Sequence, residues 1–263
     1  MGLSFWRTPI MAFILATGHP AIGSAQHSGG PHGGGSTQNS PPQTEQGPFS
    51  LRSFGAFRSM MQFKDYASKI ALAHVKSMGS THAVGALSDL RGEITMIDGR
   101  FVVSYGGGCN ACSPPHSETA TLLATARVAE WSRPIALESA LSGVQLEAFI
   151  VAQARAAGLD MTKPFPVRLK GNLTDVSMHV IEAPNEAFTG HGSRVHMAKQ
   201  DDFRHATLPG EVVGMYAPPS MQGILSHPGD PFHFHWVDME RTRTAHLDGF
   251  GMEKGSELIL PIR

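Results

Sequence analysis

The segment 232–248 limits what this chain can fold into more than any other part of the sequence. It consists of an alternating run, Phe-His-Phe-His-Trp-Val, a polar stretch at 238–243, and a second run, Thr-Ala-His-Leu-Asp. Alternate residues of a β-strand share a face, so His233 and His235 lie on one side and the aromatic residues on the other. If the polar stretch is a hairpin loop, His246 lies opposite His235, with Cβ atoms about 4.5–5.5 Å apart. Three imidazoles would then converge on one point.

Three converging imidazoles are typical of a metal site. Three neutral nitrogen ligands with one open coordination position are the usual composition of a catalytic zinc centre. The competing interpretation is a row of histidines on an exposed sheet face, which a His-Phe-His pattern alone would favour. The third histidine, at hairpin register, favours the metal site. The sequence therefore predicts that His233, His235 and His246 bind a divalent ion, with zinc preferred over iron or manganese because imidazoles suit zinc.

The composition argues against several classes of partner. Lys and Arg number 21 against 22 Asp and Glu, and no basic cluster alternates with aromatic residues, so no nucleic-acid partner is predicted. No apolar run reaches about eighteen residues, so no membrane-spanning helix is predicted. Two cysteines, Cys109 and Cys112, are too few for a disulfide-dense scaffold. Because prolines rather than a helix follow this Cys-x-x-Cys loop, a short loop disulfide is preferred over a redox or metal motif.

The first fifty residues differ in composition from the rest. Residues 1–25 combine a basic residue, an apolar stretch and a small-residue cleavage site, which predicts an export signal and a periplasmic or secreted protein. The alternative is a disordered apolar leader. Residues 26–52 are rich in Gly, Ser, Pro, Gln and Thr, a composition typical of a flexible linker. The folded domain is therefore predicted to cover residues 53–263.

Glu93 begins a predicted hairpin. The strands 93–97 and 100–105 flank Asp98-Gly99, a dipeptide that a two-residue hairpin turn favours. By strand alternation the Glu93 carboxylate faces the interior, which is unusual and indicates a candidate catalytic residue. The alternative is an exposed glutamate at the end of a strand.

The remaining periodic segments complete an α+β fold with more sheet than helix. Helical spacing and a capping box predict helices at 63–78 and 142–157. Further predicted elements are strands at 120–128, 166–169, 173–181, 211–217 and 255–262, a turn at 170–172, and a crossing loop at 183–203.

Several of these segments resemble alpha-acetolactate decarboxylases. The stretch 84–99, which contains Gly-Glu-Ile-Thr-Met-Ile-Asp-Gly, resembles the family's Leu-Asp-Gly-Glu-Leu-Ile-Ala-Leu-Asp-Gly block. Residues 165–171 resemble its central strand and turn. The segment 210–248, with Gly-Glu-Val-Val-Gly, Gln-Gly, Phe-His-Phe-His and Ala-His-Leu-Asp, resembles the region that carries the family's histidines. The resemblance extends over about residues 57–250, and the combination of motifs is more specific than any one of them.

The resemblance implies a fold of two packed β-sheet subdomains with a few helices and with the site between them. It implies a metal-dependent enzyme, usually with zinc, that converts 2-hydroxy-2-methyl-3-oxobutanoate (2-acetolactate) into acetoin and CO2. His233, His235 and His246 would be the zinc ligands and Glu93 the active-site carboxylate. The implied partner is a small α-hydroxy-β-keto acid, with no nucleic acid and no membrane, and a homodimer is left open.

The sequence departs from the family pattern at two places. The family has an arginine on the strand after the central turn. The corresponding position in this sequence is approximately that of His179, which becomes a candidate catalytic residue. The family's C-terminal glutamate has no match, because Glu257 is too near His246. The candidates for a replacement cation are Arg168, Arg194 and Arg243. Two other functions therefore stay open: another metal-dependent lyase or hydrolase step, for which a titratable His179 would suit proton transfer, or a non-catalytic metal-binding relative.

Overall fold

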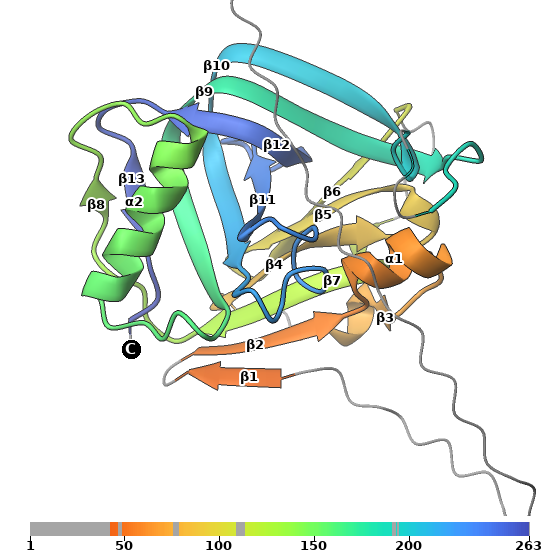
Figure 1. Cartoon of the computed structure of the whole chain (residues 1–263), viewed down its shortest axis with the longest axis horizontal. Helices are drawn as coiled ribbons and strands as arrows, with labels where there is room; N and C mark the ends of the chain where they lie inside the picture. Colours follow the sequence, from red (N-terminus) through yellow and green to blue (C-terminus); the bar gives the residue numbers. More distant parts are fainter. Residues whose placement is uncertain are drawn as a thin grey trace, which may run out of the picture. The chain divides into compact units, whose positions relative to one another are not determined.

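The computed structural model describes residues 43–46, 49–75, 79–108, 114–190, 193 and 195–262. All of them belong to one unit, Ser40–Arg263. Two antiparallel β-sheets make up most of this unit (Figure 1). The predicted export signal at 1–25, together with Cys109 and Cys112, lies outside the described residues. No helix in the described ranges is long and apolar enough to cross a membrane.

The first sheet has the strand order β1-β2-β7-β4-β5-β6, and β3 also pairs with β7. Its strands are β1 Gln43–Gln46, β2 Phe49–Phe54, β3 Ile70–Ala71, β4 Thr81–Leu87, β5 Gly92–Ile97, β6 Arg100–Tyr105 and β7 Thr119–Val128. Between β5 and β6, Asp98 and Gly99 have φ angles of 49° and 77°. Positive φ at both central residues is the geometry of a type I′ turn, so the predicted hairpin is confirmed.

The second sheet has the order β10-β11-β12-β9-β13-β8, and β10 also pairs with β9. Its strands are β8 Ile135–Ala136, β9 Phe165–Pro184, β10 Ala198–Tyr216, β11 Phe232–Val237, β12 Thr244–Met252 and β13 Glu257–Ile259. The four strands β9, β10, β11 and β12 therefore pair in a closed circuit. The histidine hairpin has the predicted register, with His235 opposite His246 and a loop at 238–243.

Helices are few in the described residues. They are α1 Phe57–Phe63, α2 Gly143–Ala156 and three short 3₁₀ turns, Leu72–His74, Ser88–Leu90 and Pro115–Ser117. The predicted capping box is present at the start of α2, where the side chain of Gln145 accepts a hydrogen bond from the backbone N–H of Ser142 at 3.0 Å. Leu146, Ile150 and Ala154 form the buried face of α2. They share a core with residues of both sheets, such as Val84 and Phe165, so the predicted β-rich fold of two packed sheets is confirmed.

Two predicted elements differ from the structure because long-range pairing overrides local periodicity. The helix predicted at 63–78 is wrong: α1 ends at Phe63, and the left-handed Lys64 (φ 52°) donates its N–H to Met60. Ile70 instead pairs with β7, although residues 76–78 lie outside the described ranges. The turn predicted at 170–172 is also wrong, because β9 continues through Gly171 and pairs with β10 on both sides of it.

The predicted linker and loop are shorter than expected. The predicted linker includes two strands of the first sheet: β1 pairs with β2, and Phe49 and Leu51 of β2 are buried and pair with β7. The sheet therefore already includes residues 43–46 and 49–54, and apolar and polar residues alternate in β2. The crossing loop predicted at 183–203 spans only residues 185–197, because β9 and β10 extend as a long two-stranded ribbon (Figure 1).

An ion cluster connects the two sheets beside the histidine hairpin. Asp98, at the β5–β6 turn, pairs with Arg168 of β9 at 3.0 Å and with Arg241 of the hairpin loop at 2.9 Å. Both arginines also pair with Glu211 of β10 at 2.8 Å. His82 of β4 completes the cluster, 3.2 Å from Asp98. The cluster thus anchors the hairpin loop to both sheets.

We expect the Glu211→Gln substitution to lower the free energy of unfolding by about 2 kcal/mol. It removes the carboxylate that compensates two guanidinium groups; the loss is smaller than the ~3–5 kcal/mol of a fully buried pair because Arg241 is partly exposed. Urea denaturation measures the change. The matched control is Lys163→Met, which removes an exposed ion pair of 3.8 Å and should change stability by less than about 1 kcal/mol. Equal effects of the two substitutions would contradict a structural role for the cluster.

Candidate active site

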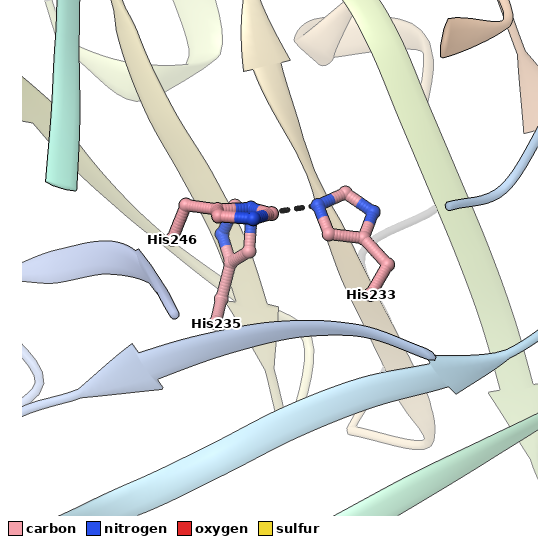
Figure 2. Close-up of side chains that lie close together, drawn as sticks. All are labelled: His233, His235 and His246. Carbon is pink, nitrogen blue, oxygen red and sulfur yellow. Dashed lines mark hydrogen bonds between the residues drawn. The ribbon is translucent and has the colours of Figure 1, made fainter. Parts of the chain in front are cut away.

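Three imidazoles converge between the two sheets. His233 and His235 come from β11 and His246 from β12, and all three are buried. One nitrogen from each ring lies within 4.8 Å of the others, close enough for one metal ion (Figure 2). The predicted convergence of these three histidines is confirmed.

The nitrogen chemistry of the trio fits a cation. His233 donates its Nδ1–H to the carbonyl of Leu225 at 3.0 Å, which leaves a lone pair on Nε2 when the ring is neutral. That Nε2 lies 3.0 Å from the Nε2 of His235 (Figure 2). Burial, and then the neighbouring imidazoles, lowers the pKa of His233, His235 and His246 well below the usual value. The rings are therefore neutral at neutral pH, the form that binds a divalent ion.

His179 extends the row of histidines onto β9. It pairs directly with His246 across the strands, and their ring centroids are 4.8 Å apart. The register of β12 shifts between Leu247 and Gly249, so Asp248 is an extra residue in a β-bulge. Bulges redirect side chains, and here the Asp248 carboxylate accepts a hydrogen bond from Nδ1 of His179 at 2.9 Å. Burial lowers the pKa of His179, but Asp248 and Glu93 outweigh it, so the net pKa is raised.

Glu93 reaches the histidines from the first sheet. One carboxylate oxygen lies 3.6 Å from Nε2 of His235, and the other lies 3.9 Å from Nε2 of His179. Burial raises the pKa of Glu93 to about 7, partly opposed by the charge of His179. Glu93 therefore exchanges a proton near neutral pH, as a general acid or base requires.

A cavity of about 320 Å³ opens beside this group, lined by His179, His196, Gln200, His227 and Asp248 among others. A second cavity of about 200 Å³ borders His233 and His246. His227 and Asp248 lie on both cavities. Both cavities border histidines and carry polar side chains among apolar ones, so a small polar molecule could reach the imidazoles.

Sequence reasoning missed Asp248, His227 and Thr95 as members of this site. Thr95 lies 3.1 Å from His235, and strand alternation from Glu93 is a signal that could have found it. Asp248 stands two residues after His246, but its use depends on the bulge. His227 belongs to the loop before β11, and no local pattern marks it.

The residues considered as a replacement cation do not join the site. Arg168 pairs with Asp98 and Glu211 in the ion cluster. Arg243 pairs with Asp238 at 3.3 Å, and Arg194 lies outside the described residues. His179, whose pKa is raised by Asp248 and Glu93, is instead the basic side chain that lies beside Glu93, at 3.9 Å.

Comparison with protein families decides the identity of the domain. A family model described as alpha-acetolactate decarboxylase matches residues 54–261. The chain belongs to this family. The predicted resemblance is confirmed, and the match extends beyond the segment 57–250 that carried it. As a class, the family comprises carboxy-lyases that act on a small molecule.

Three solved structures share the fold of this chain. An alpha-acetolactate decarboxylase from Bacillus subtilis strain 168 is 15% identical, with a TM-score of 0.62, over 81% of this chain and 86% of that chain. An acetolactate decarboxylase from Bacillus subtilis subspecies spizizenii is 16% identical over the same shares, with a TM-score of 0.65. A Staphylococcus aureus protein described as similar to this enzyme is 17% identical, with a TM-score of 0.56, again over 81% and 86%. No curated protein matches the chain.

The raised pKa of Glu93 predicts how stability changes with pH in the metal-free protein. The folded state holds this proton up to about pH 7, whereas the unfolded state releases it near 4.5, so this group lowers stability as pH rises between these values. Glu93→Gln removes this dependence. In urea denaturation with chelator, the variant should gain up to about 3 kcal/mol over the wild type between pH 5 and pH 7.5, since one pKa unit is about 1.4 kcal/mol. A stability difference that is constant with pH would contradict the raised pKa.

Proposed function

We propose that this protein is a zinc-dependent decarboxylase that converts 2-acetolactate into acetoin and CO2. The observation that carries the proposal is the position of Glu93. Its buried carboxyl group, with a pKa near 7, lies within 4 Å of both His235 and His179. An acid that can donate a proton beside a candidate metal site is what this reaction requires.

His233, His235 and His246 would hold the ion in the proposed enzyme. A bound divalent ion would act there as a Lewis acid on the substrate's oxygen atoms. The three residues contribute neutral nitrogen ligands, and burial excludes competing water. Zinc is proposed because three imidazoles with one open position suit zinc.

Glu93 would supply the proton that replaces CO2. In the net reaction the bond between the carboxylate and the tertiary carbon breaks, and its electron pair moves toward the neighbouring carbonyl group. One proton must then be added at carbon to give acetoin, so 2-acetolactate anion plus one proton yields acetoin plus CO2. The carboxyl group of Glu93 carries this proton near neutral pH and recovers it from solvent after each turnover.

His179 would take over the role of the family's missing arginine. Its raised pKa favours an imidazolium, held by the hydrogen bond from Nδ1 to Asp248, with Nε2 directed to Glu93. A cation there can attract the carboxylate of the substrate into the cavity of about 320 Å³. Because imidazole is smaller than guanidinium and can lose its charge, a related α-hydroxy-β-keto acid is the alternative substrate that this substitution favours.

An acetoin assay with purified, zinc-loaded protein tests the proposal. We expect acetoin from 2-acetolactate, loss of activity after chelation, and recovery with added zinc. Glu93→Gln should lower kcat by about 10²–10⁴-fold, the usual contribution of a general acid, and should leave zinc binding intact. The matched control is Glu138→Gln, an exposed glutamate remote from the site, which should retain full activity.

Two outcomes would contradict the proposal. Turnover that persists after both chelation and Glu93→Gln would exclude the metal and acid roles together. Zinc bound at one ion per chain without turnover of any α-hydroxy-β-keto acid would indicate a non-catalytic metal-binding relative instead.

A further inference from the structure

A chain of buried hydroxyl groups connects His235 to the first sheet. Thr95 on β5, Thr244 on β12 and the ring of His235 are each no more than 1% exposed. Thr95 Oγ1 lies 3.1 Å from His235 Nδ1 and 2.6 Å from Thr244 Oγ1. Thr244 Oγ1 in turn lies 2.9 Å from the carbonyl oxygen of Trp236. Because these groups are shielded from solvent, they need hydrogen-bond partners within the protein.

The direction of each hydrogen bond in this series of side chains follows from the last acceptor, the carbonyl oxygen of Trp236. A carbonyl oxygen only accepts, so Thr244 donates its single hydroxyl hydrogen to Trp236. Thr244 can then only accept from Thr95, which uses the single hydroxyl hydrogen of Thr95. Thr95 therefore accepts at its other contact, and the hydrogen there must be on Nδ1 of His235.

This direction decides which nitrogen of His235 is free. A neutral imidazole carries one hydrogen, so a hydrogen on Nδ1 leaves a lone pair on Nε2. Nε2 is the atom that faces His233 at 3.0 Å and Glu93 at 3.6 Å, in the candidate metal site. The opposite tautomer would place a hydrogen on the atom that has to bind the ion.

The relay, meaning the hydrogen-bonded hydroxyl groups of Thr95 and Thr244, is also held in position by the first sheet. The backbone N–H of Thr244 donates to Ser104 Oγ of β6 at 2.8 Å, and Ser104 is the register partner of Glu93. The β5–β6 hairpin that carries Glu93 thus orients the hydroxyl pair. His235 also has a backbone hydrogen bond with Ile94 that raises its pKa, so the threonines share the orientation of the ring with the main chain.

We propose that Thr95 and Thr244 are positioning residues that lock His235 in the tautomer whose Nε2 binds the metal. The inference rests on the metal site of the proposed function and deepens it. Thr95 accepts from the ring only because Thr244 takes the hydrogen of Thr95. Without Thr244, the hydroxyl of Thr95 is free to donate to Nδ1 and to favour the wrong tautomer.

The test compares four variants in two measurements. Thr95→Val removes the acceptor, Thr244→Val frees the Thr95 hydroxyl, and Thr95→Ser keeps the hydroxyl. Thr121→Val removes a buried hydroxyl of β7 that donates to the backbone carbonyl of Asp65. Zinc affinity is measured by competition with a chelator. The His235 tautomer is measured in metal-free protein by nitrogen-15 NMR of the imidazole ring, with His235→Ala to assign the signal.

We expect both valine variants at the relay to bind zinc about tenfold more weakly, the lower end of the usual effect for such partners because Ile94 also contributes. In metal-free protein both should lose part of the Nδ1–H signal of His235, more so in Thr244→Val. Thr95→Ser and Thr121→Val should match the wild type in both measurements, and circular dichroism verifies folding.

Three results would overturn the proposal: unchanged zinc affinity in both valine variants, weaker affinity with an unchanged tautomer, or failure of Thr95→Ser to retain the wild-type values. None of these measurements uses the decarboxylation reaction. An enzyme that proves inactive on 2-acetolactate therefore leaves the test of the relay intact.

Discussion

The packing of β5 against the histidine hairpin is the contact on which the site depends. The second sheet alone brings four histidines into a row, but it provides neither the carboxyl group of Glu93 nor the hydroxyl that contacts Nδ1 of His235. Both come from β5, whose Glu93 and Thr95 lie 3.6 Å and 3.1 Å from that ring. The ion cluster around Asp98 anchors the turn that follows β5 to the hairpin loop and to β9. Displacing either sheet would therefore separate the acid from the histidines.

Burial is the common cause of the site's electrostatics, and it acts in opposite directions on acids and bases. It raises the pKa of Glu93 to about 7 and lowers the pKa values of His233, His235 and His246. The acid therefore keeps a proton to donate, and the three bases keep their lone pairs. His179 is different because Asp248 compensates the burial of its ring, so its pKa is raised. One desolvated pocket thus combines a neutral ligand set, a carboxyl group with a pKa of about 7 and an imidazole with a raised pKa.

Local alternation in the sequence was enough to predict the central geometry. The period of two in β11 placed His233 and His235 on one face, and the polar loop at 238–243 fixed the register of His246. The Asp98-Gly99 turn likewise fixed the strand that contains Glu93, so the inward direction of its side chain could be predicted. These predictions succeeded because each depends on a short segment whose turn sets the pairing.

Features that depend on pairing between distant segments could not be predicted from local sequence patterns. The expected helix at 63–78 fails because β7 recruits Ile70, and the expected turn at 170–172 fails because β10 pairs with β9 along its length. Asp248 reaches His179 only through a bulge whose position depends on the register between β12 and β9. Strand alternation places Thr95 on the face of Glu93, but its contact with His235, 140 positions away, depends on how the two sheets pack.

Zinc X-ray absorption spectroscopy of the loaded protein tests the central claim most directly. The convergence of His233, His235 and His246 predicts one ion per chain with three imidazole nitrogens at about 2.0–2.1 Å, one further light-atom ligand and no sulfur. The His246→Ala variant should lose one imidazole from this shell. A wild-type spectrum with fewer than three imidazoles, or with a sulfur ligand, would contradict the account.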